Sequence, residues 1–144
     1  MSTRLISDTH PDSKVLRRVT RVLEENHLCS IATVNADGTS HINTAYFSFT
    51  DVSNLYFLSN PRTAHCRNIA SRGNVSLTIC DSRQPWGESL LGLQLFGESS
   101  LAAGDDVARA EHSYSARFES YKTWIENDAN LLCAGITNVV NQGA

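Results

Sequence analysis

The spacing of apolar and polar residues predicts a chain that begins with a helix and continues through short strands and further helices. Apolar residues recur at helical spacing between Ser13 and Asn26, which predicts an amphipathic helix capped by Asp12 or Ser13. Apolar or alternating runs predict strands over Cys29–Asn35, Thr39–Phe49, Asn54–Leu58, Asn74–Cys80, Leu90–Leu101 and Leu131–Val140. Further helices are expected over Thr63–Ser71 and Asp105–Phe118. This order predicts an α+β fold, a mostly antiparallel barrel of about six strands with flanking helices.

The most informative segment is SIATVNADGTSHINTAYF, from Ser30 to Phe47. Its centre is typical of a tight hairpin turn, because Gly38 accepts positive φ and Asp37 bonds to nearby backbone amides. The strand after the turn mixes hydrogen-bonding side chains with bulky apolar ones. We interpret it as a strand that holds a ligand.

Length, composition and charge favour one soluble domain over residues 1–144, with residues 1–11 expected to be a flexible leader. A chain of 144 residues buries roughly two-thirds of its unfolded surface, enough for one core. A formal net charge of -3 with 19% charged residues disfavours a nucleic-acid binder. The sequence has no apolar run of about 20 residues and no apolar signal-peptide core near its start. We therefore expect a cytoplasmic protein with no nucleic-acid or membrane partner.

The cysteines and histidines do not predict a metal site. The four cysteines, Cys29, Cys66, Cys80 and Cys133, form no Cys-x-x-Cys pair and are expected to be buried structural residues. Cys66 is the exception, because a neighbouring imidazole at His65 would make it a candidate reactive thiol. The histidines His10, His27, His41, His65 and His112 lack the spacing of metal ligands.

Three segments in order, SIATVNADGTSHINTAYF, LYFLSNPRTAHCRNIASRGNVSLTI and GLQLFGES, carry a family resemblance. The chain resembles the pyridoxamine 5'-phosphate oxidase-like FMN-binding split β-barrels over nearly its whole length, and its later part resembles a small subgroup of uncharacterised bacterial members. The resemblance implies a six-stranded split barrel. It also implies a homodimer that binds two FMN molecules in clefts at the interface.

The resemblance also implies which residues contact the flavin. The strand beside the isoalloxazine ring corresponds to His41, Ile42, Asn43, Thr44, Ala45 and Tyr46. The phosphate segment corresponds to Ser59, Asn60, Arg62, Thr63, Ala64 and His65, with Arg62 and Thr63 foremost, just before a helix whose free amides assist. Gln94 matches a glutamine that approaches the flavin or its ribityl chain. The alternatives are a solvated strand face for the first set, helix caps and surface charges for the second, and an exposed strand glutamine for Gln94.

The phosphate segment departs from the family pattern. Many members carry a second cation where this chain has Ala64 and then His65, which is only partly charged at neutral pH. We therefore expect weaker phosphate affinity, which Arg67 would partly restore if it faced the ligand.

The aromatic and C-terminal segments refine the expected activity. The C-terminal arginine and tryptophan segment of the true vitamin oxidases has no counterpart before Ala144, so oxidation of pyridoxamine phosphate is not expected. Trp124, on a helix before the last strand, is interpreted as core or dimer packing. Trp86 is interpreted as an anchor of the loop over residues 81–89, with stacking over a ligand cleft as the alternative.

Two classes of function fit these residues. The first is an FMN-dependent oxidoreductase that takes a hydride from a reduced nicotinamide or a small-molecule substrate, the flavin supplying the chemistry. The second is a flavin or haem binder that does not turn over. A deazaflavin variant of the first class, using F420, ranks below FMN because its polyglutamate tail favours a basic groove, of which a net charge of -3 gives little sign.

Overall fold

The computed structural model describes residues 13–127 and 136–140, which form an α+β fold. The elements are α1 (Ser13–Glu25), β1 (Leu28–Val34), β2 (Ser40–Asp51), β3 (Asn54–Leu58), α2 (Ala64–Ser71), β4 (Asn74–Cys80), β5 (Gly92–Leu101), α3 (Asp105–Arg117), α4 (Tyr121–Asn127) and β6 (Ile136–Val140). Some of the predicted features lie outside the described residues. They are the expected leader over residues 1–11 and residues 131–135 of the last predicted strand, which include Cys133.

The strands form a curled antiparallel sheet. β1 pairs with β2 and β4, β2 with β3, and β4 with β5. β6 pairs with β3 and β5, so the strand order β1-β2-β3-β6-β5-β4 closes on itself. The predicted α+β class, the antiparallel sheet and the flanking helices are confirmed.

The hairpin between β1 and β2 forms the turn that its sequence predicts. Gly38 has a φ of 85°, which a residue with a Cβ rarely adopts. The Asp37 carboxylate accepts hydrogen bonds from the Thr39 backbone amide at 3.0 Å and the Thr39 hydroxyl at 2.6 Å. These bonds hold the carboxylate pKa below its ordinary value and fix the register in which Thr33 faces His41.

The core fills the interior of the sheet with apolar side chains from its strands, and α1 covers one end. Its members include Leu23, Ile31, Phe47, Leu77 and Ile79, each no more than 4% exposed. Alternate strand residues point inward, so the burial follows the apolar positions of the sequence.

The cysteines differ in burial, so the expectation that they are buried structural residues is only partly correct. Cys29 points inward, and its burial raises the pKa of the thiol to about 12. Cys66 is half-buried on α2. Cys80 is exposed, because it falls on the outward face of the alternating strand β4. The burial prediction was therefore wrong for Cys80.

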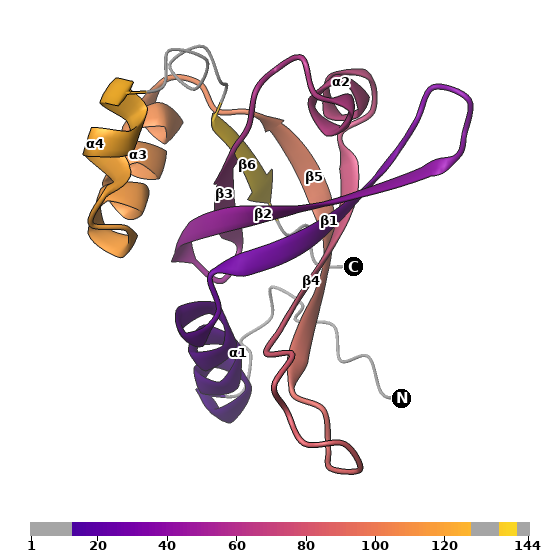
Figure 1. Cartoon of the computed structure of the whole chain (residues 1–144), viewed down its shortest axis with the longest axis vertical. Helices are drawn as coiled ribbons and strands as arrows, with labels where there is room; N and C mark the ends of the chain where they lie inside the picture. Colours follow the sequence, from indigo (N-terminus) through magenta and orange to yellow (C-terminus); the bar gives the residue numbers. More distant parts are fainter. Residues whose placement is uncertain (1–12, 128–135, 141–144) are drawn as a thin grey trace.

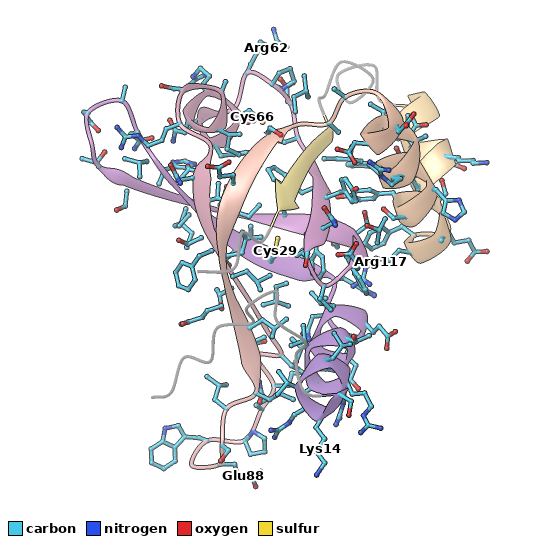
Figure 2. All side chains as sticks on the ribbon, turned by 180° about the vertical axis from the view of Figure 1, so that it is seen from behind. Lys14, Cys29, Arg62, Cys66, Glu88 and Arg117 are labelled. Carbon is cyan, nitrogen blue, oxygen red and sulfur yellow. The ribbon has the colours of Figure 1, made fainter. Side chains whose placement is uncertain are left out.

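The helices lie around the sheet in separate places (Figure 1), with α3 and α4 side by side on one flank, α1 at one end, and α2 beside the hairpin of β1 and β2. Asn68 fixes α2 to this hairpin by donating to the Thr33 hydroxyl at 3.1 Å and the Asn35 side-chain oxygen at 2.9 Å. Arg117 joins α3 to α1 (Figure 2) by donating to the carbonyl oxygens of Leu23 and Asn26.

Two kinds of feature are absent from the described residues. Within residues 13–127 and 136–140, no helix has the length and apolar character needed to cross a membrane. The same residues contain no cluster of three or more histidine, cysteine or acidic side chains suited to a metal ion.

Candidate functional site

A cavity of about 220 Å³ lies where β2 and β3 separate, bordered by the start of α2 and by α3 and α4. It is lined by Asn43, Thr44, Ala45, Tyr46, Leu58, Ser59, His65, Tyr114 and Trp124. The wall combines aromatic and apolar surface with the polar side chains of Asn43, Thr44, Ser59 and His65.

Tyr114 holds the two strands apart at the mouth of this gap. Phe47 and Phe57 are the last paired residues of β2 and β3 before the gap. Beyond them, the Tyr114 hydroxyl donates to the carbonyl oxygen of Tyr46 at 2.9 Å and accepts from the backbone amide of Leu58 at 3.1 Å. The hydroxyl therefore takes the place of a strand-to-strand hydrogen bond, and its burial raises the pKa of the phenol.

The polar side chains that line the cavity from the start of α2 belong to a cluster of two hydroxyls and an imidazole. The His65 Nε2 atom lies 2.5 Å from the Ser59 hydroxyl and 3.1 Å from the Thr63 hydroxyl. The Thr63 hydroxyl donates to the Asn60 carbonyl oxygen at 2.8 Å. Burial lowers the pKa of the His65 imidazole, because a charged ring loses hydration there.

Two aromatic rings pack against His65. The His41 ring is stacked with it, with centroids 6.3 Å apart and planes inclined by 22°. The Phe57 ring lies 6.1 Å away from its centroid. The imidazole is thus fixed in orientation by rings from β2 and β3.

Asn43 brings an amide to the wall of the cavity from β2. Its side-chain oxygen is buried and has no hydrogen-bond partner among the described residues. Such an atom gains a bond when a ligand N–H reaches it, and no existing bond has to break.

The structure brings six of the sequence-predicted residues to the cavity. The lining contains Asn43, Thr44, Ala45, Tyr46, Ser59 and His65. His41 and Thr63 are not in the lining but contact His65 from the sides.

The remaining predicted residues lie outside the cavity lining. Ile42 is 68% exposed on the outward face of β2. The Asn60 side chain accepts from the backbone amide of Arg62 at 2.9 Å and so shapes the turn before α2. Arg62 itself is exposed at one end of the molecule (Figure 2), and Gln94 is exposed on β5. The Arg67 guanidinium bonds to the carbonyl oxygen of Arg62.

Three cavity residues were not predicted: Leu58, Tyr114 and Trp124. Trp124 was interpreted as core or dimer packing, and the core interpretation is wrong because the side chain is 55% exposed at the cavity. The sequence indicated only that Tyr114 lies on a helix, and nothing in the pattern pointed to a role at a ligand site. Tyr114 and Trp124 belong to α3 and α4, which are distant in sequence from the strands β2 and β3 that they contact at the cavity.

The loop over residues 81–89 does not reach this cavity. Glu88, in the loop, lies at the opposite end of the molecule from Arg62 (Figure 2). Trp86 is fully exposed, so its interpretation as the loop anchor is wrong. Gln84 fulfils that role instead, because its amide bonds to the backbone of Asp81 and Leu91.

Comparison with known proteins places the chain among one family of sequences and one group of folds. Residues 16–133 match the sequence model described as pyridoxamine 5'-phosphate oxidase. No curated protein matches the chain.

Three solved structures illustrate the shared fold. A protein of unknown function from Agrobacterium tumefaciens is 18% identical, with a TM-score of 0.72 over 99% of this chain and 60% of that protein, so this chain spans less than two-thirds of it. The haem storage protein HutZ from Vibrio cholerae is 14% identical, with a TM-score of 0.73 over 89% of this chain and 90% of its own. An FAD-binding protein from Mesorhizobium loti is 17% identical, with a TM-score of 0.66 over 99% of this chain and 94% of its own. At these identities the likeness is one of fold.

Proposed function

We propose that this chain, which belongs to the pyridoxamine 5'-phosphate oxidase family, binds FMN in its cavity and acts as an FMN-dependent oxidoreductase. The observation that carries the proposal is the composition of the cavity wall. An aromatic and apolar surface runs into a cluster of hydroxyls and an imidazole at the start of a helix. This is the combination that a flat heteroaromatic ring with a phosphate tail requires.

The individual residues fit the parts of FMN. Tyr46, Tyr114 and Trp124 offer aromatic surface to the ring system. The unpartnered oxygen of Asn43 suits the N–H of the pyrimidine edge. The Ser59 hydroxyl, held beside the His65 ring, offers a donor to the phosphate, and the free amides at the start of α2 add to it.

The chain's own contribution is binding, orientation and the exclusion of water. When bound, FMN supplies the hydride and electron chemistry, so no catalytic acid, base or nucleophile is required of the chain. A reduced nicotinamide or another small molecule is the proposed electron donor.

The size of the cavity supports a site completed by a second copy of the chain. Small-molecule sites usually enclose about 300–1,000 Å³, whereas this cavity has about 220 Å³. One chain therefore supplies only part of the enclosure for a ligand the size of FMN. We propose that a homodimer supplies the rest.

The outward face of β2, β1, β4 and β5 is the proposed dimer surface. One row across it runs from Ile42 through Ala32 and Ser76 to Phe96, and Ile42 and Phe96 are 68% and 44% exposed. The described helices do not bury these two apolar side chains. The face is continuous with the cavity, because Thr44 belongs both to the cavity lining and to the next row of the face.

The homodimer also accounts for Gln94, the predicted flavin contact that lies outside the cavity. Thr44 and Gln94 are at opposite ends of one row, with Ser30 and Thr78 between them. Three strand spacings separate them by about 14 Å. We propose that Gln94 contributes to the cavity of the second copy.

Haem is the second candidate ligand, because the cavity lining contains the imidazole of His65. However, the His65 Nε2 atom is already engaged by Ser59 and Thr63, and an iron ligand requires that nitrogen to be free. This engagement favours FMN over haem. F420 presents a ring similar to that of FMN, and we retain it as the alternative flavin-type cofactor.

The visible absorbance spectrum of the purified protein tests the proposal, with denaturation to release and identify any chromophore. We expect an oxidised flavin spectrum, or one that appears on titration with FMN and saturates at one FMN per chain. Anaerobic addition of a reduced nicotinamide should then bleach the flavin band. A protein that binds haem or F420 but not FMN would overturn the cofactor assignment, and FMN binding to a monomer would overturn the shared site.

A further inference from the structure

We propose that His65 is a positioning residue that turns the Ser59 hydroxyl toward the phosphate of the ligand, and that phosphate binding is coupled to uptake of a proton by His65. This inference rests on the proposed function, because it concerns how the same cavity receives the FMN phosphate. Proton uptake on binding is a role that a permanently charged lysine or arginine at this position would not have.

The hydroxyl protons of the cluster determine which atom donates to which. The Thr63 hydroxyl has one proton, and it donates that proton to the Asn60 carbonyl oxygen at 2.8 Å. Toward His65, 3.1 Å away, the Thr63 oxygen is therefore left as an acceptor. We therefore assign a proton to the His65 Nε2 atom, because two acceptors facing each other would repel.

The same proton on His65 decides the state of Ser59. The Ser59 oxygen, 2.5 Å from Nε2, accepts from the same N–H that faces Thr63. The Ser59 hydroxyl proton is then not donated to His65. It can point either to the Thr63 hydroxyl, at a long distance of 3.3 Å, or into the cavity. A phosphate oxygen in the cavity is a stronger acceptor than the Thr63 hydroxyl, so it takes the Ser59 proton.

The surroundings of His65 keep its ring neutral until an anion arrives. Its titratable neighbours in the cavity are the phenols Tyr46 from β2 and Tyr114 from α3, and the residue from α4 is Trp124, which does not titrate. The described lining contains no carboxylate to hold a positive charge on the imidazole.

The other neighbours of the ring are basic or neutral. His41 stacks on it from β2, and Cys66 follows it on α2. The Arg67 guanidinium donates to the carbonyl oxygen of Arg62. A bound phosphate dianion would therefore be the first negative charge near His65, and it would favour the imidazolium.

The consequence is that phosphate affinity depends on pH with the sign of proton uptake. Affinity is highest where free His65 is already protonated and falls as the pH rises through the pKa that His65 has in the complex. In this way, the positive charge that many family members carry permanently in the phosphate segment would form here on His65 when the phosphate binds.

The test is calorimetric titration of the purified protein with FMN at about pH 6.5 and about pH 8.0, in buffers of different ionisation enthalpy. Riboflavin, which lacks the phosphate, is the matched ligand control. His65→Gln is the matched variant, because its amide keeps an N–H near the Nε2 position but cannot take up a proton. Ser59→Ala removes the hydroxyl that His65 positions.

For the wild type, we expect FMN binding to take up a fraction of a proton near neutral pH. At the lower pH, the wild type should bind FMN roughly 3- to 10-fold more tightly than His65→Gln does. Riboflavin binding should show neither effect. Ser59→Ala should weaken FMN roughly 5- to 20-fold while leaving riboflavin unchanged. The ring ¹⁵N shifts of His65 in the free protein should show a protonated Nε2.

The outcomes separate this inference from the proposed function. FMN binding with the same proton count in the wild type and His65→Gln, or an unprotonated Nε2 in the free protein, would overturn the role of His65 while leaving FMN binding intact. A protein that binds neither FMN nor riboflavin at either pH would overturn the proposed function itself.

Discussion

Replacing Tyr114 with phenylalanine removes one oxygen atom from the point where β2 and β3 separate. The hydroxyl is 2.9 Å from the Tyr46 carbonyl oxygen and 3.1 Å from the Leu58 amide nitrogen, and the Tyr114 side chain is buried. A buried donor left without an acceptor costs about 1–3 kcal/mol, and the lost bond to the carbonyl adds about 0.5–1.5 kcal/mol. We therefore expect Tyr114→Phe to lower the free energy of unfolding by about 2–4 kcal/mol.

Thermal unfolding followed by circular dichroism measures this effect. For a domain of this size the loss corresponds to a fall in Tm of roughly 6–15 °C. Tyr121→Phe is the matched control, since its ring stacks on Tyr114 at 5.4 Å and its hydroxyl takes no part in the bridge between β2 and β3; it should change stability by less than about 0.5 kcal/mol. Equal losses in the two variants would show that Tyr114 acts only through its ring. FMN affinity should also fall in Tyr114→Phe, because Tyr46 and Leu58 both line the cavity.

Three further changes test other parts of the structure. Asn68→Ala should lower the free energy of unfolding by about 1–3 kcal/mol in urea titrations, because the side chains of Thr33 and Asn35 lose a buried donor; an unchanged midpoint would contradict this. The pKa of His65 is lowered by burial from its ordinary value of 6.5. The unfolded chain therefore binds the proton more readily, so the contribution of neutral His65 to stability is present above about pH 6.5 and is lost as the pH falls toward the folded pKa. Urea titrations of the wild type and His65→Gln across that range should diverge on the acid side, and parallel curves would contradict the assignment. Arg62→Ala should weaken FMN binding by about 1.5–3 kcal/mol if the arginine turns to the phosphate, and an unchanged affinity would refute its role there.

The elements were predictable where the sequence pattern is local. The strands over Asn54–Leu58 and Asn74–Cys80 have the predicted bounds, because apolar runs are flanked by residues that end a strand. The helix predicted over Thr63–Ser71 begins one residue later, with Thr63 as its N-cap. The helix that carries Trp124 was expected, but its bounds were not.

The site was predictable only in its local parts. Ser59, Thr63 and His65 fall within seven residues at the start of one helix, so a turn and a helix suffice to bring them together. The exposure of Arg62 could not be predicted in this way, because the direction of a long side chain depends on what packs around the turn.

The sequence by itself determined the family and the α+β class. It also determined the alternation along β2, in which Asn43 and Ala45 face one side and Ile42 and Thr44 the other. These properties follow from patterns within a few residues. Only the tertiary structure decided that the Tyr114 hydroxyl, 56 positions from Leu58, would bridge β2 and β3, and that Gln94 would lie three strands from the cavity of its own chain. Both depend on which helix packs over which gap and on which strands pair. Such choices are made by the burial of surface between distant segments, and no local period in the sequence records them.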